Sequence, residues 1–124
     1  MMLVKNFVKV SEIHGIGVFA GQHIKQGDKI WEFIEGMDVT FPAEVLDSPV
    51  ESIRAYMRRY TYPHPHIPGD IILDGDNGRF MNHSSTPNTD FKTPNVGYAL
   101  VDIPEGTELT CDYGEFSEGL TPED

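Results

Sequence analysis

Glycine and proline interrupt this chain so often that long regular elements cannot form over most of its length. The 124 residues include 12 Gly and 9 Pro. Proline stops a helix beyond its first turn, and glycine favours turns over helix or strand interiors. Short strands joined by turns are therefore expected. The length suits one hydrophobic core, so we expect a single, mainly β domain over residues 1–124.

The alternation of apolar and polar residues predicts where the strands lie. Strand-like runs occupy residues 3–10, 16–20, 30–36, 71–74, 98–103 and 108–113. Turns are expected at Gly27-Asp28, before the third run, and at Pro104-Glu105-Gly106, between the last two runs.

One helix is expected to begin at Ser48. Ser48 offers a capping hydroxyl, Pro49 suits the first helical position, and Glu51 stands three residues after the cap. The helix should end before the proline-rich stretch YPHPHIPGD. Its exposed side carries the dense basic cluster of the chain, which we interpret as a solvated face: Arg54, Arg58 and Arg59.

The formal net charge of −11 at pH 7 argues against nucleic acid as a direct partner. Lys92 is the last basic residue, and eight carboxylates follow it: Asp102, Glu105, Glu108, Asp112, Glu115, Glu118, Glu123 and Asp124. This acidic end is either a solubilising tail or a surface that attracts a basic protein or peptide. Composition alone leaves both interpretations open.

Cysteine usage and hydropathy suggest an intracellular protein, cytoplasmic or, in a eukaryote, nuclear. Cys111 is the only cysteine, so neither an intramolecular disulfide nor a cysteine-type zinc site can form. The N-terminal MMLVKNFVKV lacks the apolar core of a signal peptide, and no apolar run is long enough to span a membrane.

Gly15-Ile16-Gly17 begins a G-x-G-x-x-A pattern that ends at Ala20. A dinucleotide site of this kind needs a helix that opens at the glycines, and Gly21 and Gly27 would interrupt that helix. We therefore reject the dinucleotide interpretation. The pattern is then either a bend between strands or a place where a ligand approaches the backbone closely.

Two further patterns do not predict a reactive centre. His64-Pro65-His66 offers only two histidines without a carboxylate at ligand spacing, so no metal site is expected. Cys111 with His83 could suggest a thiol nucleophile. Alternation along ELTCDYG instead places Cys111 on the same face as Leu109 and Tyr113, so we expect it to line the interior.

The stretch RFMNHSSTPN (79–88) carries Asn82 and His83 from an apolar run into a turn. Read alone, these two side chains could simply bond to nearby backbone, because asparagine, serine and proline are ordinary turn residues. The role of Asn82 and His83 can be interpreted only together with motifs elsewhere in the chain.

Three patterns in a fixed order, Gly15-Ile16-Gly17, RFMNHSSTPN and then ELTCDYG (108–114), resemble the SET-domain protein lysine methyltransferases. The resemblance covers residues 4–114 and leaves 115–124 as an acidic tail. It implies a β-clip fold of small sheets with one or two short helices. It also implies a C-terminal pseudoknot, an exception to the rarity of threaded loops.

The resemblance implies that the chain transfers a methyl group from S-adenosylmethionine to the side-chain amine of lysine. The glycine backbone would meet the amino-acid end of the cofactor, and the Asn82 amide would offer both a donor and an acceptor. His83 would meet the adenine, and Phe116 would cover the adenine ring. The implied cofactor-binding residues are Gly15, Ile16, Gly17, Asn82, His83 and Phe116.

Tyr113 matches the essential catalytic tyrosine of the family. The lysine amine, with an ordinary pKa of about 10.4, would lose its proton more readily in an apolar channel close to the sulfonium. Tyr60, Tyr98 and Cys111 are expected to line that channel. Relatives usually carry Phe or Tyr at position 111, so the number of methyl groups added stays open.

The implied partner is a basic protein or peptide, histone or histone-like, without nucleic acid, membrane or metal. The family's C-terminal zinc cluster is absent from EFSEGLTPED, so Phe116, the substrate or a homodimer partner would close the site. Two rival interpretations are a catalytically inert SET-fold module that binds a peptide or partner, and a methyltransferase acting on something other than protein lysine.

Overall fold

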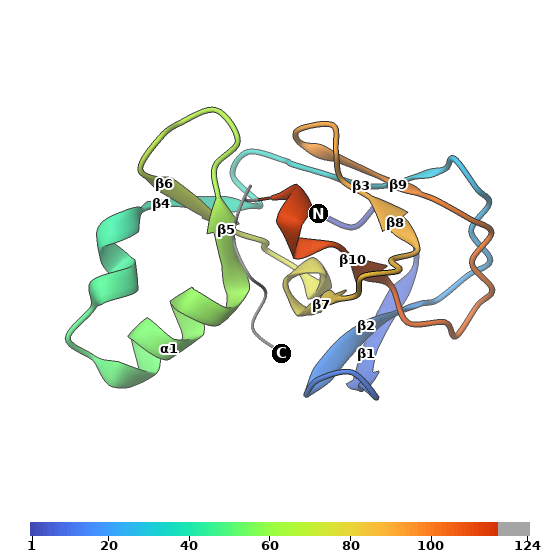
Figure 1. Cartoon of the computed structure of the whole chain (residues 1–124), viewed down its shortest axis with the longest axis horizontal. Coiled ribbons are helices and arrows are strands. Elements are labelled where there is room, and N and C mark those ends of the chain that lie inside the picture. The colour runs from blue at the N-terminus through green and yellow to red at the C-terminus, as the bar shows by residue number, and fades with distance from the viewer. Residues whose placement is uncertain (117–124) are drawn as a thin grey trace.

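Ten short strands in four small sheets form the framework of the computed structural model, which describes residues 1–116 (Figure 1). The strands are β1 (Asn6–Val10), β2 (Ile16–Ala20), β3 (Lys29–Glu32), β4 (Val39–Pro42), β5 (Thr61–Pro63), β6 (Asp70–Leu73), β7 (Asn82–His83), β8 (Thr89–Asp90), β9 (Val96–Ala99) and β10 (Thr110–Cys111). They pair in the orders β1-β2, β4-β6-β5, β3-β9-β8 and β10-β7. The expected mainly β fold of small sheets is confirmed.

The predicted strand runs overlap β1, β2, β3, β6, β9 and β10. The third run ends at Glu32, earlier than predicted, because the chain turns from Ile34, whose carbonyl accepts from the Met37 and Asp38 amides. Four strands, β4, β5, β7 and β8, have no counterpart in the sequence prediction. β7 and β8 are two residues long, too short for alternation to show. β5 contains Pro63 but lies at a sheet edge, where proline is tolerated.

The helix α1 (Glu51–Tyr60) begins later than predicted, and the expected cap at Ser48 is wrong. Ser48 lies at the end of a preceding 3₁₀ helix, η1 (Ala43–Asp47), and its hydroxyl accepts from the Val50 amide at 3.2 Å. The helix ends at Tyr60, as the following prolines require. No helix within residues 1–116 is long and apolar enough to cross a membrane.

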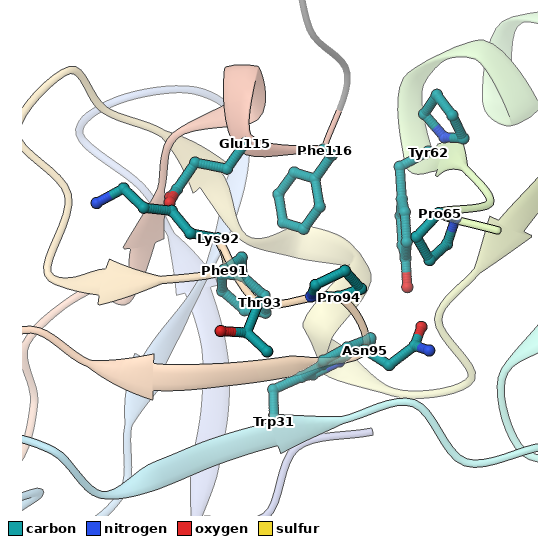
Figure 2. Close-up of a pocket in the computed structure, with 11 residues that line it drawn as sticks. Trp31, Tyr62, Pro65, Phe91, Lys92, Thr93, Pro94, Asn95, Glu115 and Phe116 are labelled. Carbon is teal, nitrogen blue, oxygen red and sulfur yellow. The ribbon is translucent and has the colours of Figure 1, made fainter.

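Buried hydrophobic side chains from most of the strands form one core: Val18, Ala20, Ile24, Ile30, Trp31, Met81, Phe91, Ala99, Ile103, Leu109 and Cys111. At one side of it lies a cluster that we call the aromatic group, Trp31, Tyr62, Phe91 and Phe116 (Figure 2). The ring of Phe91 lies 5.6 Å from Trp31 and 5.1 Å from Phe116. The Phe116 ring also lies 5.2 Å from Tyr62. Such edge-on and tilted pairs are favourable aromatic geometries.

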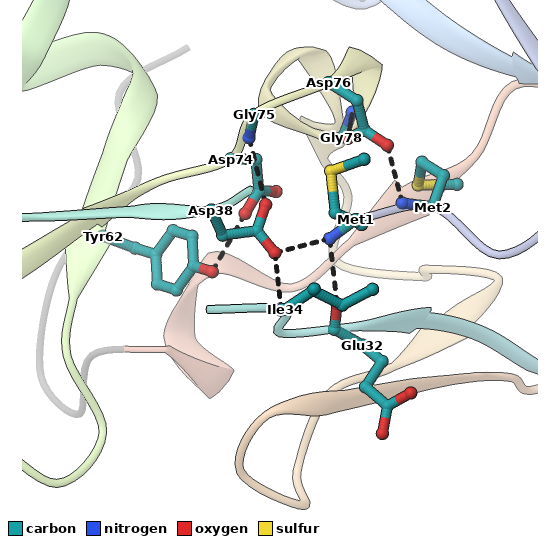
Figure 3. Close-up of polar contacts among 10 residues, drawn as sticks. All are labelled: Met1, Met2, Glu32, Ile34, Asp38, Tyr62, Asp74, Gly75, Asp76 and Gly78. Atoms are coloured by element: carbon teal, nitrogen blue, oxygen red, sulfur yellow. Dashed lines mark hydrogen bonds and ion pairs between the residues drawn. The ribbon is translucent and has the colours of Figure 1, made fainter. Parts of the chain in front are cut away.

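Two buried carboxylates, Asp38 and Asp74, lie next to the aromatic group (Figure 3). The Tyr62 hydroxyl donates to Asp74 Oδ1 at 3.0 Å. Asp38 accepts hydrogen bonds from three amino or amide groups, those of Met1, Ile34 and Gly75. Burial raises the pKa of Asp74 to about 6, the Met1 amino group opposes this rise, and Asp38 adds to it.

The C-terminal strand β10 pairs in parallel with β7, with Thr110 opposite Asn82 and Cys111 opposite His83. Figure 1 shows the two strands side by side near the middle of the molecule. Parallel neighbours cannot be joined by a tight turn, and the chain makes a long excursion through β8 and β9 before it returns as β10.

The other edge of the β10 segment is held by Asn88, the last residue of the RFMNHSSTPN motif. Its Nδ2 donates to the Glu108 carbonyl at 2.8 Å, and its Oδ1 accepts from the Thr110 amide at 2.9 Å. Thr89 Oγ1 donates to the Thr110 carbonyl at 2.7 Å. Residues 82–89 therefore wrap around residues 108–111, which is the pseudoknot that the resemblance implied.

Replacing Asn88 with alanine should lower the free energy of unfolding by about 1–3 kcal/mol, because a backbone donor and a backbone acceptor of the threaded segment lose their partner. Denaturant unfolding followed by circular dichroism measures this loss. Ser85→Ala, an exposed change in the same loop, should stay within about 0.5 kcal/mol of the parent. Equal stability of the two variants would show that Asn88 does not hold the strand.

The pKa of Asp74 makes a second prediction, on pH dependence. Because its folded-state pKa of about 6 lies above the ordinary 3.8, the folded state binds a proton that the unfolded state lacks between these values. Stability should therefore rise as the pH falls through 6. Between pH 7 and pH 5 the wild type should gain about 1 kcal/mol relative to Asp74→Asn. Parallel pH profiles of the two proteins would contradict this.

Candidate functional site

The side-chain amide of Asn82 joins three segments that lie far apart in the sequence. Asn82 is only 1% exposed. Its Nδ2 donates to the backbone carbonyls of His14 at 3.0 Å and Ile16 at 3.4 Å, and to Glu108 Oε2 at 3.0 Å. The Gly-x-Gly segment, the Asn-His motif and the C-terminal motif therefore meet at one buried amide.

Glycine occupies positions 15 and 17 for different structural reasons. A side chain at Gly17 would put its Cβ 2.4 Å from Glu108 Oε2, so glycine is needed for that carboxylate to reach Asn82. Gly15 has a φ of +46°, and no atom lies within 4 Å of the position where its Cβ would be. Gly15 therefore borders open space, whereas the space at Gly17 is filled by the protein itself.

Tyr113 begins the 3₁₀ turn η3 (Tyr113–Glu115) directly after β10, and this brings it to the same place. Its hydroxyl donates to the carbonyl of Met81 at 2.9 Å, the residue before Asn82. Burial, followed by the neighbouring Cys111, raises the pKa of Tyr113 to about 12, and Arg59 opposes this rise. The phenol therefore keeps its proton at neutral pH.

His83 lies against Tyr113, with ring centroids 5.3 Å apart. The backbone amide of Tyr113 donates to His83 Nδ1 at 3.1 Å. An accepting Nδ1 means that the imidazole carries its proton on Nε2 in this arrangement. The contact fixes both the tautomer and the orientation of the ring.

Cys111 is 2% exposed, and its Sγ lies 4.0 Å from the Asn82 carbonyl. Burial raises the pKa of the thiol well above its usual range. A buried neutral thiol is a poor nucleophile, in agreement with the expectation that Cys111 lines the interior.

The two other tyrosines predicted for the channel lie in different places. Tyr60, at the end of α1, packs between Tyr56 and Phe80, with ring centroids at 4.7 and 5.5 Å. Tyr98 lies on β9 opposite Asp90, in a different sheet from β7 and β10. Of these two tyrosines, only Tyr60 lies next to the site, because Arg59, its neighbour on α1, contacts Asn82.

Phe116 lies in the aromatic group, which lines a hollow of about 70 Å³ together with Pro63, Pro65 and Glu115, among others (Figure 2). Figure 2 shows that these side chains come from four separate parts of the chain. The sequence prediction did not include Trp31, Tyr62 or Phe91 in a site. The only available signal was the clustering of aromatic and proline residues in the segments that meet here.

Arg59 was interpreted as part of a solvated face, and this is wrong because its side chain turns toward the site. Its Nη2 lies 2.9 Å from His14 Nδ1 and donates to Asn82 Oδ1 at 3.2 Å. Arg58, one residue earlier, is exposed and pairs with Asp47 at 2.9 Å. Helical periodicity would place neighbours on different faces, but it could not say which face meets the site.

Metal-ligand geometry does not occur in the described part of the chain. Residues 1–116 contain no group of three or more His, Cys, Asp or Glu side chains that could hold a metal ion. In the His64-Pro65-His66 stretch, His64 Nδ1 instead accepts from the backbone amides of His66 and Ile67, both at 3.0 Å.

Comparison with curated proteins finds distant relatives among histone methyltransferases. The chain is 33% identical over 121 residues to a histone-lysine N-methyltransferase, H3 lysine-4 specific, of Schizosaccharomyces pombe, covering 83% of this chain and 12% of the relative. It is 31% identical over 112 residues to a histone-lysine N-methyltransferase, H3 lysine-36 specific, of Mycosarcoma maydis, covering 83% of this chain and 11% of that relative. The chain thus spans only about an eighth of the length of these relatives.

Solved structures share the fold. A putative histone methyltransferase of Plasmodium falciparum matches with a TM-score of 0.61 and 21% identity, over 91% of this chain and 96% of that chain. The Polycomb Repressive Complex 2 of Chaetomium thermophilum, bound to the inhibitor GSK126, matches with a TM-score of 0.68 and 20% identity, over 94% of this chain and 16% of that chain. Residues 15–114 match the family described as the SET domain. Together with the relatives, this match shows that the chain belongs to the SET domain family.

Proposed function

We propose that this chain is a protein-lysine N-methyltransferase that uses S-adenosylmethionine. The observation that carries the proposal is the meeting of Tyr113 with Asn82. The Tyr113 hydroxyl donates to the carbonyl of Met81, the residue before Asn82. The side-chain amide of Asn82 in turn donates to the His14 carbonyl, next to the Gly-x-Gly segment. Membership of the SET domain family and relatives named as histone-lysine methyltransferases support it further.

The residues around Gly15 fit the amino-acid end of the cofactor. Gly15 leaves open space beside the backbone, and the carbonyls of His14 and Ile16 are held in place by Asn82. These carbonyls and Glu108 are acceptors suited to an ammonium group. His83, with a proton on Nε2, offers a donor for a ring nitrogen of adenine. The role of Phe116 as a cover for the adenine stays a prediction.

When bound, S-adenosylmethionine supplies a methyl group activated by its positively charged sulfur. The chain must hold the lysine amine in its neutral form and in line with that methyl group. Alignment of the amine with the methyl group accounts for a large part of the rate enhancement over the uncatalysed reaction. Burial of the amine in an apolar channel lowers its pKa by desolvation.

Tyr113 contributes a fixed, neutral hydroxyl. Because the pKa of Tyr113 is raised to about 12, the phenol stays protonated, and its bond to Met81 sets the direction of the O–H group. The lone pairs of the oxygen then remain as acceptors, and Arg59 is one neighbouring donor to them. They can accept a hydrogen bond from the amine and so orient its own lone pair.

We assign the target lysine to the hollow lined by the aromatic group, a role for Phe116 that is an alternative to covering the adenine. Aromatic faces attract an ammonium group and accept the apolar lysine stem. The hollow, which Lys92 and Glu115 also line, is connected to Tyr113 through the backbone of η3, where the Phe116 amide donates to the Tyr113 carbonyl at 3.1 Å. Tyr60, Tyr98 and Cys111 stay predictions for the channel, and so does a homodimer that would complete it.

The proposed substrate is a lysine in a basic protein or peptide, histone or histone-like. Two relatives are named for activity on histone H3. The net charge of −11 favours a basic partner over an acidic one. Residues 117–124 of the acidic tail lie outside the described residues.

Tyr113→Phe should lower methyl transfer by about 100-fold or more, because the hydroxyl that orients the amine is lost. Transfer of radiolabelled methyl from S-adenosylmethionine to a mixture of histones measures this. Calorimetry with S-adenosylhomocysteine is the control, and its affinity should stay within a few-fold of the wild type. Full activity of the variant would refute the assigned mechanism. A wild type that binds neither compound would favour an inert binding module.

Raising the salt concentration should weaken capture of a basic peptide, because salt screens exposed charges. The distance over which such charges interact falls from about 10 Å at 0.1 M to about 3 Å at 1 M ionic strength. The KM for the peptide should rise several-fold between 0.05 and 0.5 M NaCl, whereas the affinity for S-adenosylhomocysteine should change little. A KM that is independent of salt would remove the electrostatic role of the acidic surface.

A further inference from the structure

Arg59 reaches from the last turn of α1 to the polar side of Asn82. The guanidinium Nη2 donates to Asn82 Oδ1 at 3.2 Å and lies 2.9 Å from His14 Nδ1. Arginine can only donate, so His14 must accept with a neutral ring for this contact to form. The side chain is therefore positioned over the same amide that gathers the three motifs.

Arg59 is partly buried, and its contacts leave one buried donor without a partner in the described part of the chain. Its Nε is buried, with no hydrogen-bond partner among residues 1–116. Within the same described residues, no carboxylate lies within ion-pair distance of Arg59, whereas Arg58 pairs with Asp47. The guanidinium also meets the Tyr113 hydroxyl and lies 5.9 Å from the centre of the Tyr60 ring, so all of its partners are neutral. A buried donor without a partner is costly, and neutral acceptors are weak partners for a guanidinium. The arrangement suits an anionic ligand.

Asn82 divides the site into two sides of opposite character. Its Oδ1 faces the positive Arg59, and its Nδ2 faces Glu108 and the carbonyls of His14 and Ile16. A ligand that spans the amide would meet a cation on one side and acceptors on the other. The amino-acid end of S-adenosylmethionine has this pattern, with a carboxylate and an ammonium on one carbon.

We propose that Arg59 binds the carboxylate of the cofactor's amino-acid end and so selects ligands that carry this group. The inference rests on the proposed function. The fork of an arginine matches a carboxylate with two parallel hydrogen bonds, a geometry that lysine cannot provide. A carboxylate would also give the guanidinium the charged partner that the described residues do not supply.

The proposal requires a rotation of the Arg59 side chain, whereas the helix that carries it has several contacts with the rest of the protein. Arg79 Nη1 donates to the Tyr56 hydroxyl at 2.8 Å, and the Tyr60 ring packs on Phe80 at 5.5 Å. The guanidinium would turn from Asn82 Oδ1 toward the ligand.

The test compares two ligands that differ only in the carboxylate, S-adenosylmethionine and its decarboxylated form. Isothermal titration gives the ratio of their dissociation constants in each protein. The wild type should bind the decarboxylated form on the order of 10- to 100-fold more weakly, the range expected for a charge-assisted pair. In Arg59→Met this ratio should fall to within about three-fold of unity.

Arg58→Met is the matched control, since it removes a neighbouring arginine of the same helix that pairs away from the site. It should keep the wild-type ratio. Arg59→Lys, which keeps the charge and loses the fork, should give an intermediate ratio. Thermal unfolding reports whether each variant is folded.

A wild-type ratio near unity would overturn the inference without any variant. An unchanged ratio in folded Arg59→Met would overturn it too, while the proposed function would stand. A wild type that binds neither ligand would overturn both. A ratio reduced only in the Arg59 variants supports the assignment, because a merely structural role would weaken both ligands equally.

Discussion

The parallel pairing of β10 with β7 is the constraint on which the rest of this molecule depends. It brings residues 110–111 beside residues 82–83, and Asn88 closes the other edge of the threaded segment with two hydrogen bonds. The approach of Tyr113 to Asn82 follows from this pairing. Tyr113 lies two residues after β10, and Asn82 is part of β7 itself. If the strands slipped in register, the phenol and the amide would separate.

The Asn82 amide both organises the structure and forms part of the proposed binding site. It is buried, it holds the carbonyls before and within the Gly-x-Gly segment, and it meets the Glu108 carboxylate for which Gly17 makes room. A substitution at Asn82 would therefore disturb the local fold as well as any ligand. Arg59 and Tyr113, which we propose to act on ligand and substrate, lie at the rim of this arrangement. They are better positions at which to separate binding or chemistry from folding.

The sequence predicted the fold class, six of the strands and the three motifs that meet in space, because these are encoded in local alternation and in long, ordered patterns. Alternation could not reveal β7 and β8, which are two-residue strands stabilised by partners distant in the chain. Ser48 has a hydroxyl suited to capping a helix N-terminus, but it is instead the residue that ends η1. The aromatic group and Arg59 could not be predicted, since each depends on which faces of separate elements meet.

The threaded loop also determines when in the life of the chain the site can form. The segment that passes between β7 and Asn88 follows the 82–89 loop only after β8 and β9, and contacts between distant segments are slow to form. A nascent chain that lacks residues 108–113 has no strand for the 82–89 loop to surround, so its Asn-His motif stays without its partners. The site is thus expected to form only once residues 108–113 are available to pair, and a chain cut short before Tyr113 would lose the site entirely.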